Sequence, residues 1–136
     1  GLLAAPWVRE WAGRVVVLPQ VDHDDYLRIN LACDAMLDSV RWSGGNTSLD
    51  AIACGLPIAT RPGTFMRGRQ SAGMLELIGA ADLVAADEDA LVANAVRLAE
   101  DAPWRAELSA RMRDGSKALF DDVEPVAALA AALDGR

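Results

Sequence analysis

The fold of this chain is decided by residues 42–60, which read WSGGNTSLDAIACGLPIAT. Gly44 and Gly45 accept backbone angles that residues with a Cβ avoid, and Asn46 is a good N-cap for a helix that starts there. Gly55 suits the C′ position that ends such a helix, and the apolar, β-branched residues after it suit a strand. The stretch therefore predicts a loop, a short helix and a buried strand, in that order.

The start of this helix has two interpretations. One is an ordinary loop–helix–strand unit, since Gly-Gly followed by a capping residue is common. The other is a phosphate cradle, because a helix N-terminus carries unpaired N–H groups and a partial positive charge, to which Thr47 and Ser48 add hydroxyls. Asp50, one turn further on, is then available for a ribose hydroxyl. The stretch contains neither the G-x-G-x-x-G fingerprint nor a Walker loop.

The composition is that of a globular, acidic chain. Its 136 residues are 52% hydrophobic and carry a net charge of −7. A chain of this length and hydrophobic content can bury a core. Because its net charge is negative, we do not expect nucleic acid or an anionic membrane as its main partner. No signal peptide is recognisable, and no apolar run approaches the ~20 residues of a membrane span. Cys33, Cys54 and His23 make no metal-ligand pattern, so we expect both thiols to be reduced, buried and structural in a cytoplasmic chain.

The order of predicted elements indicates one partial α/β domain over residues 1–136. We expect a leading helix over 1–13, a sheet core with ligand-side loops over 14–85, and C-terminal helices over 86–136. Strands that alternate with helices of about ten residues predict βαβ units. Such units form a Rossmann-like parallel sheet with helices on both faces.

Four segments of the core predict strands. Residues 14–18 read RVVVL, a near-continuous β-branched run that is typical of buried strands in parallel sheets. Shorter apolar segments lie around Met36 and Ile58, and residues 82–85 provide a last short strand. We expect the strands near Val15, Met36 and Ile58 to be adjacent and parallel.

Ligands of parallel α/β sheets bind outside the carboxyl ends of the strands. The loops at residues 20–25, 39–47 and 61–69 would therefore share one edge, and most of the unusual residues lie there. His23 is a candidate ligand contact or an ordinary exposed His. Tyr26 is a candidate for stacking on a base or for filling the core.

Arg67 and Arg69 stand at or just before a predicted helix start, which is the unfavourable end of the helix dipole for a cation. At least one of them is a candidate contact for an anionic ligand, and the alternative is pairing with the acidic residues 22–25. Asp38, at a strand end, is expected to cap the following turn. No nucleophile with its base is recognisable in the sequence.

Three stretches, in this order and spacing, resemble one family. Residues 31–38 (LACDAMLD), 44–51 (GGNTSLDA) and 55–63 (GLPIATRPG) resemble the C-terminal half of the O-linked N-acetylglucosamine transferase/SPINDLY family. Residues 65–69 (FMRGR) resemble a variant common in its bacterial, tetratricopeptide-fused members. The resemblance runs over about residues 14–120.

The resemblance implies an inverting, metal-independent GT-B glycosyltransferase that needs no cofactor, of which this chain is the N-terminally truncated donor-binding lobe. By resemblance, Asn46 and Thr47 match positions that hold the pyrophosphate, Asp50 matches a carboxylate on the ribose, and residues 21–23 match contacts to uracil and ribose. The candidate nucleotide-binding residues are Val21, His23, Tyr26, Gly45, Asn46, Thr47, Ser48, Asp50, Arg67 and Arg69. Catalytic residues are not assigned.

Some positions depart from related patterns. Gly45 and Tyr26 stand where eukaryotic members of the family carry His, and His23 stands where they carry Lys. Retaining GT-B enzymes have two acidic residues eight positions apart, but Trp42 stands eight positions before Asp50, which favours the inverting class.

The function implied is the transfer of a sugar from a donor that resembles UDP-GlcNAc to Ser or Thr hydroxyls of a protein. N–H groups near the start of the central helix would stabilise the departing diphosphate. Two alternatives remain open, namely a non-catalytic, nucleotide-binding regulatory module and a degenerate structural domain. We expect little or no transferase activity from this chain alone, and self-association through an exposed strand edge.

Overall fold

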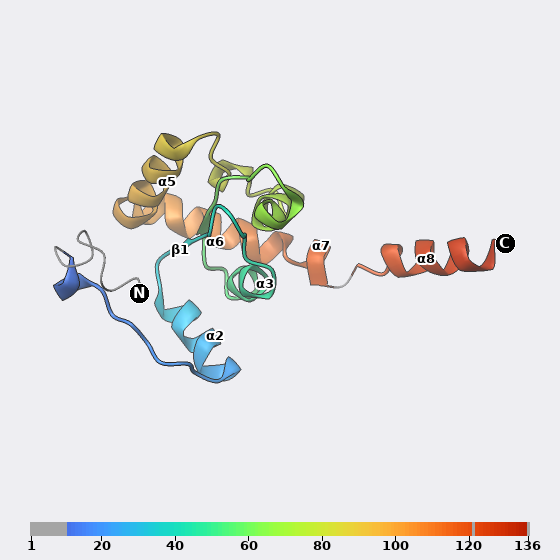
Figure 1. Ribbon diagram of the computed structural model, residues 1–136, viewed down its shortest axis with the longest axis horizontal. Coiled ribbons are helices and arrows are strands. Elements are labelled where there is room, and N and C mark those ends of the chain that lie inside the picture. The colour runs from blue at the N-terminus through green and yellow to red at the C-terminus, as the bar shows by residue number, and fades with distance from the viewer. Residues whose placement is uncertain (1–10, 121, 136) are drawn as a thin grey trace.

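Helices make up most of the computed structural model, which describes residues 11–120 and 122–135 (Figure 1). The helical elements are, in chain order, η2 (Ala12–Arg14), α2 (His23–Ala32), α3 (Asn46–Ala53), η3 (Met66–Gly68), α4 (Gln70–Leu77), η4 (Ala81–Leu83), α5 (Glu88–Glu100), α6 (Ala102–Gly115), α7 (Lys117–Phe120) and α8 (Glu124–Asp134). The predicted leading helix over 1–13 falls largely on residues that lie outside this description.

A small parallel sheet lies among these helices. Strand β1 (Met36–Leu37) pairs with strand β2 (Ile58–Ala59), with Met36 opposite Ile58. An isolated parallel bridge between Thr60 and Val84 continues the sheet on the other side of β2. The predicted parallel pairing of the segments near Met36 and Ile58 is confirmed, and with it an α/β arrangement. The predicted last strand is reduced to this bridge after η4.

The prediction of a buried strand over residues 14–18 is wrong. Residues 15–20 have no regular structure, and the side chains of Val15, Val16, Val17 and Leu18 are 46–81% exposed. In Figure 1 this blue segment runs as an extended trace between η2 and α2. Among the described residues, β1 pairs with β2 alone. The β-branched run therefore has strand propensity but no neighbouring strand to supply hydrogen bonds and cover its side chains.

The hydrophobic core joins the sheet to α3, α4, α5 and α6. Its largest fully buried apolar side chains are Ile52, Ile58, Leu75, Leu83, Leu98, Leu108 and Met112. α3 and α5 both contact β2, and α6 contacts both of these helices. Every described residue of α8 is exposed, and Figure 1 shows this helix projecting away from the rest of the chain. None of the described helices is long and apolar enough to cross a membrane.

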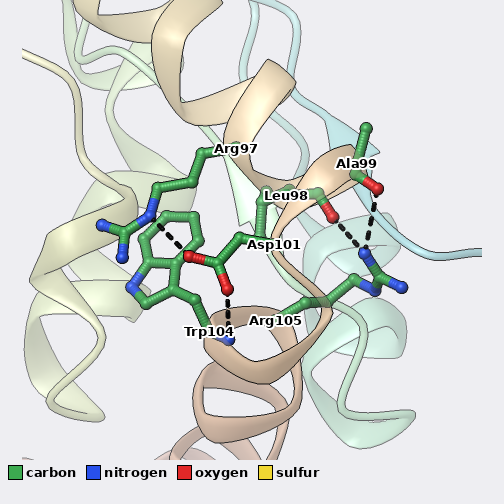
Figure 2. A network of polar contacts seen from close by, with 6 residues as sticks. All are labelled: Arg97, Leu98, Ala99, Asp101, Trp104 and Arg105. Carbon is green, nitrogen blue, oxygen red and sulfur yellow. Dashed lines mark hydrogen bonds and ion pairs between the residues drawn. The ribbon is translucent and has the colours of Figure 1, made fainter.

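The corner between α5 and α6 is held by one carboxylate (Figure 2). Asp101 Oδ1 accepts a hydrogen bond from the Trp104 N–H at 3.0 Å, and Asp101 Oδ2 accepts one from Arg97 Nε at 3.1 Å. The Trp104 N–H is the main cause that holds the pKa of Asp101 below its ordinary value, although burial opposes it. The Arg97 guanidinium also lies 4.1 Å from the centre of the Trp104 ring. This network fixes the start of α6 directly after Asp101.

Most helix ends follow their sequence signals. Asp22 and Asp87 accept hydrogen bonds from the first turns of α2 and α5, as capping residues do. Gly55 ends α3 with φ +67°, the left-handed conformation expected at C′. Asn46 is an exception, because Gly45 occupies the N-cap of α3 and Asn46 is the first helical residue. Within the predicted C-terminal helices, α6 and α7 are separated at Ser116.

The two cysteines are both free thiols, but only in part as predicted. Cys33 is exposed, which contradicts the expectation of a buried residue, because it lies just past the end of α2. Cys54 is half-buried, and its Sγ lies 3.8 Å from the Leu27 carbonyl oxygen. Burial is the main cause that raises the pKa of the Cys54 thiol. Neither of the two thiols forms a disulfide.

Candidate functional site

A cavity of about 380 Å³ opens at the N-terminus of α3. It is lined by residues 36–39, which end β1, and by residues 42–47, which lead into the helix. The N–H groups of Asn46 and Thr47 find no acceptor among the described residues, and both side chains are exposed. A helix N-terminus of this kind offers N–H donors and a partial positive charge to an anion.

The loop that leads into α3 is held by Asp38. The Oδ1 atom of Asp38 accepts from the N–H groups of Ser39 at 2.9 Å and Gly44 at 2.8 Å. Its Oδ2 atom accepts from the hydroxyls of Ser43 and Thr60, both at 2.7 Å. One carboxylate thus ties the end of β1 to the end of β2 and to the loop between them.

These contacts set the charge state of Asp38. Partial burial raises the pKa of this carboxyl, but the hydrogen bonds from Thr60, Gly44 and Ser43 outweigh it and hold the pKa below its ordinary value. Asp38 is therefore ionised at neutral pH, with its negative charge taken up by four donors. It acts as a fixed anchor of the loop.

Three buried serines extend this network towards α4. Ser71 N donates to Ser43 Oγ at 2.9 Å, and the Oγ atoms of Ser48 and Ser71 lie 2.7 Å apart. Ser43, Ser48 and Ser71 are each no more than 2% exposed. The Ser48 side chain therefore anchors the first turn of α3 to α4 and does not face the cavity, so the predicted phosphate contact of its hydroxyl is not available in this structure.

The two glycines before α3 are required by close packing. A Cβ on Gly44 would collide with Ser48 Oγ and lie 2.7 Å from Thr47 Oγ1, and a Cβ on Gly45 would lie 3.0 Å from Gln70 Oε1. Gly44 therefore allows the loop to approach the first turn of α3, and Gly45 allows it to approach the start of α4.

The loop at residues 20–25 also reaches α3, although the described residues before it form no strand. His23 Nε2 lies 3.8 Å from Asp50 Oδ1, and the His23 side chain is 66% exposed. Val21 and Tyr26 are half-buried, on either side of the start of α2. The structure thus brings His23 and Asp50 together, one turn along α3 from the open N–H groups. The roles of Val21, His23, Tyr26 and Asp50 towards a nucleotide stay predictions.

The loop at residues 61–69 lies against the loop at 39–45. Ser43 N donates to the Arg67 carbonyl oxygen at 2.8 Å. The Arg67 guanidinium lies 4.9 Å from the centre of the Phe65 ring and 5.7 Å from that of Trp42. Arg69 Nη1 donates to the Gly63 carbonyl oxygen at 3.2 Å. Neither arginine lines the cavity at α3, so both lie beside the cavity and not within it.

The main site feature that sequence reasoning missed is the hub of Asp38, Ser43, Thr60 and Ser71. Asp38 was expected to cap only its own turn, which it does through Ser39. Ser43 and Ser71 are 28 positions apart, so no local pattern links them. A weak signal exists in the sequence, because Asp38 and Thr60 directly follow two strands whose carboxyl ends meet.

Within the described residues, no group of three His, Cys, Asp or Glu side chains is placed to hold a metal ion. The expectation of metal-independent chemistry stays a prediction, because this arrangement does not test it.

Comparison with known proteins places these residues in a family. The family model described as "Glycosyl transferase family 41" matches residues 9–125. A UDP-N-acetylglucosamine–peptide N-acetylglucosaminyltransferase from Caenorhabditis elegans is 30% identical over 110 residues, which are 79% of this chain and 10% of that protein. A protein from Solanum lycopersicum, described as the probable UDP-N-acetylglucosamine–peptide N-acetylglucosaminyltransferase SPINDLY, is 29% identical over 103 residues. These are 74% of this chain and 11% of that protein.

A solved structure agrees with this. A mutant O-GlcNAc transferase from Thermobaculum terrenum superimposes with a TM-score of 0.79 and 27% identity, over 93% of this chain and 26% of that one. This chain thus spans about a tenth of the length of the two relatives named above and about a quarter of the solved structure. With the family model matching most of its length, this chain belongs to glycosyl transferase family 41.

Proposed function

We propose that this chain is the donor-binding part of an inverting, metal-independent glycosyltransferase of the GT-B type, with a Rossmann-like lobe. The donor is a nucleotide sugar that resembles UDP-GlcNAc, and the acceptor is a Ser or Thr hydroxyl of a protein. The names of the relatives support this donor and a peptide acceptor. Because this chain spans only part of those proteins, the transfer itself requires the remainder of the enzyme.

The observation that carries the proposal is the open N-terminus of α3 beside a cavity of about 380 Å³. In an inverting transfer, the acceptor oxygen forms a bond to the sugar carbon as the bond to the diphosphate breaks. Negative charge then builds on the diphosphate, and fixed N–H donors favour that charge. The N–H groups of Asn46 and Thr47, with the Thr47 hydroxyl, would supply this stabilisation. The proton of the acceptor passes to a base that this chain does not identify.

The anchoring of the loop supports this role. Preorganised donors stabilise developing charge best when they do not have to move during the reaction. The Asp38 carboxylate and the buried hydroxyls of Ser43 and Ser71 hold the loop before α3 in one conformation. Asp50, one turn along the helix and 3.8 Å from His23, would accept a hydrogen bond from the ribose.

The first test is a titration of this chain with UDP, in which calorimetry and changes of NMR chemical shifts measure the binding. Asp50→Ala should weaken UDP binding by about 1.5–3 kcal/mol, the range for a hydrogen bond to a charged group. Asp114→Ala, which removes an exposed carboxylate from α6, serves as the matched control and should leave the affinity unchanged. Equal UDP affinity for Asp50→Ala and the parent chain, with the fold intact, would remove Asp50 from the site.

The same titration addresses the alternatives. UDP binding by the full-length gene product without sugar transfer would favour a regulatory nucleotide-binding module. Absence of UDP binding to both this chain and the full-length protein would favour a degenerate structural domain.

A further inference from the structure

A second cleft, of about 310 Å³, lies between residues 40–41 and residues 61–68. Three arginines line it, namely Arg41, Arg61 and Arg67, and we call it the arginine cleft. The chain as a whole carries a net charge of −7, so a cluster of three cations on one cleft runs against the overall composition. Guanidinium groups gathered in this way repel one another unless an anion lies between them.

Two of the three guanidinium groups, those of Arg41 and Arg67, form no ion pair with the described residues. Arg41 forms no ion pair or hydrogen bond with the described residues. Arg61 Nη2 lies 3.4 Å from Glu88 Oε1, but the Glu88 side chain is 84% exposed, and exposed pairs of this kind contribute little. Arg61 Nε is buried without a hydrogen-bond partner among those residues. Arg67 lies over aromatic rings instead of beside a carboxylate.

The cleft is already formed by close contact between its two loops. Gly63 N donates to the Gly68 carbonyl oxygen at 2.6 Å. A Cβ on Gly63 would lie 3.0 Å from the Val40 carbonyl oxygen, and a Cβ on Gly68 would lie 3.1 Å from the same atom. A ligand would therefore bind without the cost of ordering these loops.

The arginine cleft adjoins the cavity at α3. Trp42 lines that cavity and contacts the Arg67 guanidinium, and the Arg67 carbonyl oxygen accepts a hydrogen bond from Ser43 N. The rim that they share carries exposed aromatic side chains, since Trp42, 69% exposed, lines the cavity at α3 and Phe65, 63% exposed, lines the arginine cleft. Exposed aromatic residues with arginine are the composition enriched in protein-binding surfaces. A polypeptide fits this rim better than a small free anion does.

We infer that the arginine cleft binds a carboxylate side chain of the acceptor polypeptide, close in sequence to the hydroxyl that receives the sugar. This inference rests on the proposed function, since it names the class of acceptor for that site. The guanidinium groups of Arg41 and Arg61 are planar and carry parallel N–H donors, so they match a carboxylate in geometry as well as in charge. The exposed aromatic rim contacts the peptide on its way to the donor cavity.

The test compares two fluorescein-labelled peptides by fluorescence anisotropy with this chain. One peptide places Glu residues beside a central Ser, and the other replaces each Glu by Gln. We expect the Glu peptide to bind at least about tenfold more tightly than the Gln peptide, and added salt to reduce this difference. The double variant Arg41→Gln/Arg61→Gln should lower the affinity for the Glu peptide to that for the Gln peptide. Arg41→Lys/Arg61→Lys should retain part of the difference.

Arg14→Gln is the matched control, because Arg14 is an exposed arginine in η2, outside the cleft, whose guanidinium lies over the Trp11 ring. It should leave the binding of both peptides unchanged. Equal binding of the Glu and Gln peptides to the parent chain overturns the inference, and this comparison needs no folded variant. Unchanged Glu-peptide affinity in the double Gln variant overturns it as well.

UDP and inorganic phosphate complete the design. We expect neither to displace the Glu peptide, because the phosphate cradle at α3 is a separate cavity. Competitive displacement by either would show that the arginine cleft is a phosphate site, and would overturn the acceptor inference. Failure of the proposed function gives a different result. In that case the parent chain does not bind UDP, whether or not it binds the peptides.

Discussion

Two segments that flank α2 behave in opposite ways. The loop at residues 38–45 contains little regular structure, yet the Asp38 carboxylate accepts four hydrogen bonds there. Three come from Ser39, Ser43 and Gly44 of the loop itself, and the fourth comes from Thr60 at the end of β2. The segment at residues 15–18 has strong strand propensity, yet it pairs with no described strand and its side chains are 46–81% exposed. The difference shows that available partners decide whether a strand forms. Local preference is not enough, because an extended segment without a neighbouring strand gains neither backbone hydrogen bonds nor cover for its apolar side chains.

The largest expected effect comes from removing the anchor of the loop. Asp38→Ala should lower the free energy of unfolding by about 3 kcal/mol, because it leaves the buried hydroxyls of Ser43 and Thr60 without their acceptor. Urea unfolding measures this. Val16→Asp, at an 81% exposed position of the other segment, should change the same quantity by no more than about 0.5 kcal/mol. Equal losses in the two variants would mean that residues 15–18 are packed after all.

The anchor also predicts a pH dependence. Burial raises the pKa of Asp38, but hydrogen bonds from Thr60, Gly44 and Ser43 leave it below the ordinary value in the folded chain. Its stabilisation is therefore fully present above the ordinary Asp pKa of about 4 and is lost as pH falls through the folded pKa. Stability measured between neutral pH and pH 2 should fall less steeply in Asp38→Asn than in the parent chain. Parallel curves would contradict an ionised anchor.

A smaller effect is expected at the helix start that the loop positions. Gly44→Ala should weaken UDP binding by about 2 kcal/mol, or about thirtyfold, because the added Cβ must displace the hydroxyls of Ser48 and Thr47. Calorimetry compares it with Gly13→Ala, where a Cβ would meet nothing within 4 Å. UDP affinity that survives Gly44→Ala would show that the precise approach of the loop does not matter for the nucleotide.

The exposed segment at residues 15–18 should cause this chain to self-associate. We expect concentration-dependent dimers in sedimentation experiments, formed through residues 15–18 and the edge of β1 that pairs with no described strand, where Leu37 is 66% exposed. The double variant Val16→Lys/Leu37→Lys should weaken this association by about tenfold, because a charge must be buried in the contact. A monodisperse monomer with enzyme-like turnover would contradict both this prediction and the expected inactivity of this chain alone.

The smallest expected effect concerns Gly73, a glycine that no close contact requires. Gly73 lies inside α4, and a Cβ there would meet nothing within 4 Å. Gly73→Ala should therefore raise the free energy of unfolding by about 0.5–1 kcal/mol, through helix propensity alone, and leave UDP binding unchanged. Thermal and urea unfolding measure the gain, and a loss of stability would indicate an unseen close contact.

Local signals predicted most of the helices. Asp22, Asp87 and Asp101 cap α2, α5 and α6, which is the ordinary role of Asp before a helix, and Gly55 ends α3 in the left-handed conformation. Each of these features depends on residues within about one helical turn. The loop edge was predictable too, because parallel strands place their carboxyl ends together. The contact of Ser43 with Arg67 follows from this rule, because the two residues lie in the loops after β1 and β2. The contact of His23 with Asp50 does not, because the segment before His23 forms no strand.

The sequence by itself determined the local elements, the family resemblance and the gathering of candidate ligand residues at one edge, since these depend on short-range periodicity, caps and chain order. Tertiary structure alone decided that Asp38 anchors the loop, that Ser48 faces Ser71 instead of the cavity, and that residues 15–18 form no strand. The reason is physical. Hydrogen bonds across 22 to 28 positions and the pairing of a strand depend on what lies beside each residue in space, which local propensity does not encode.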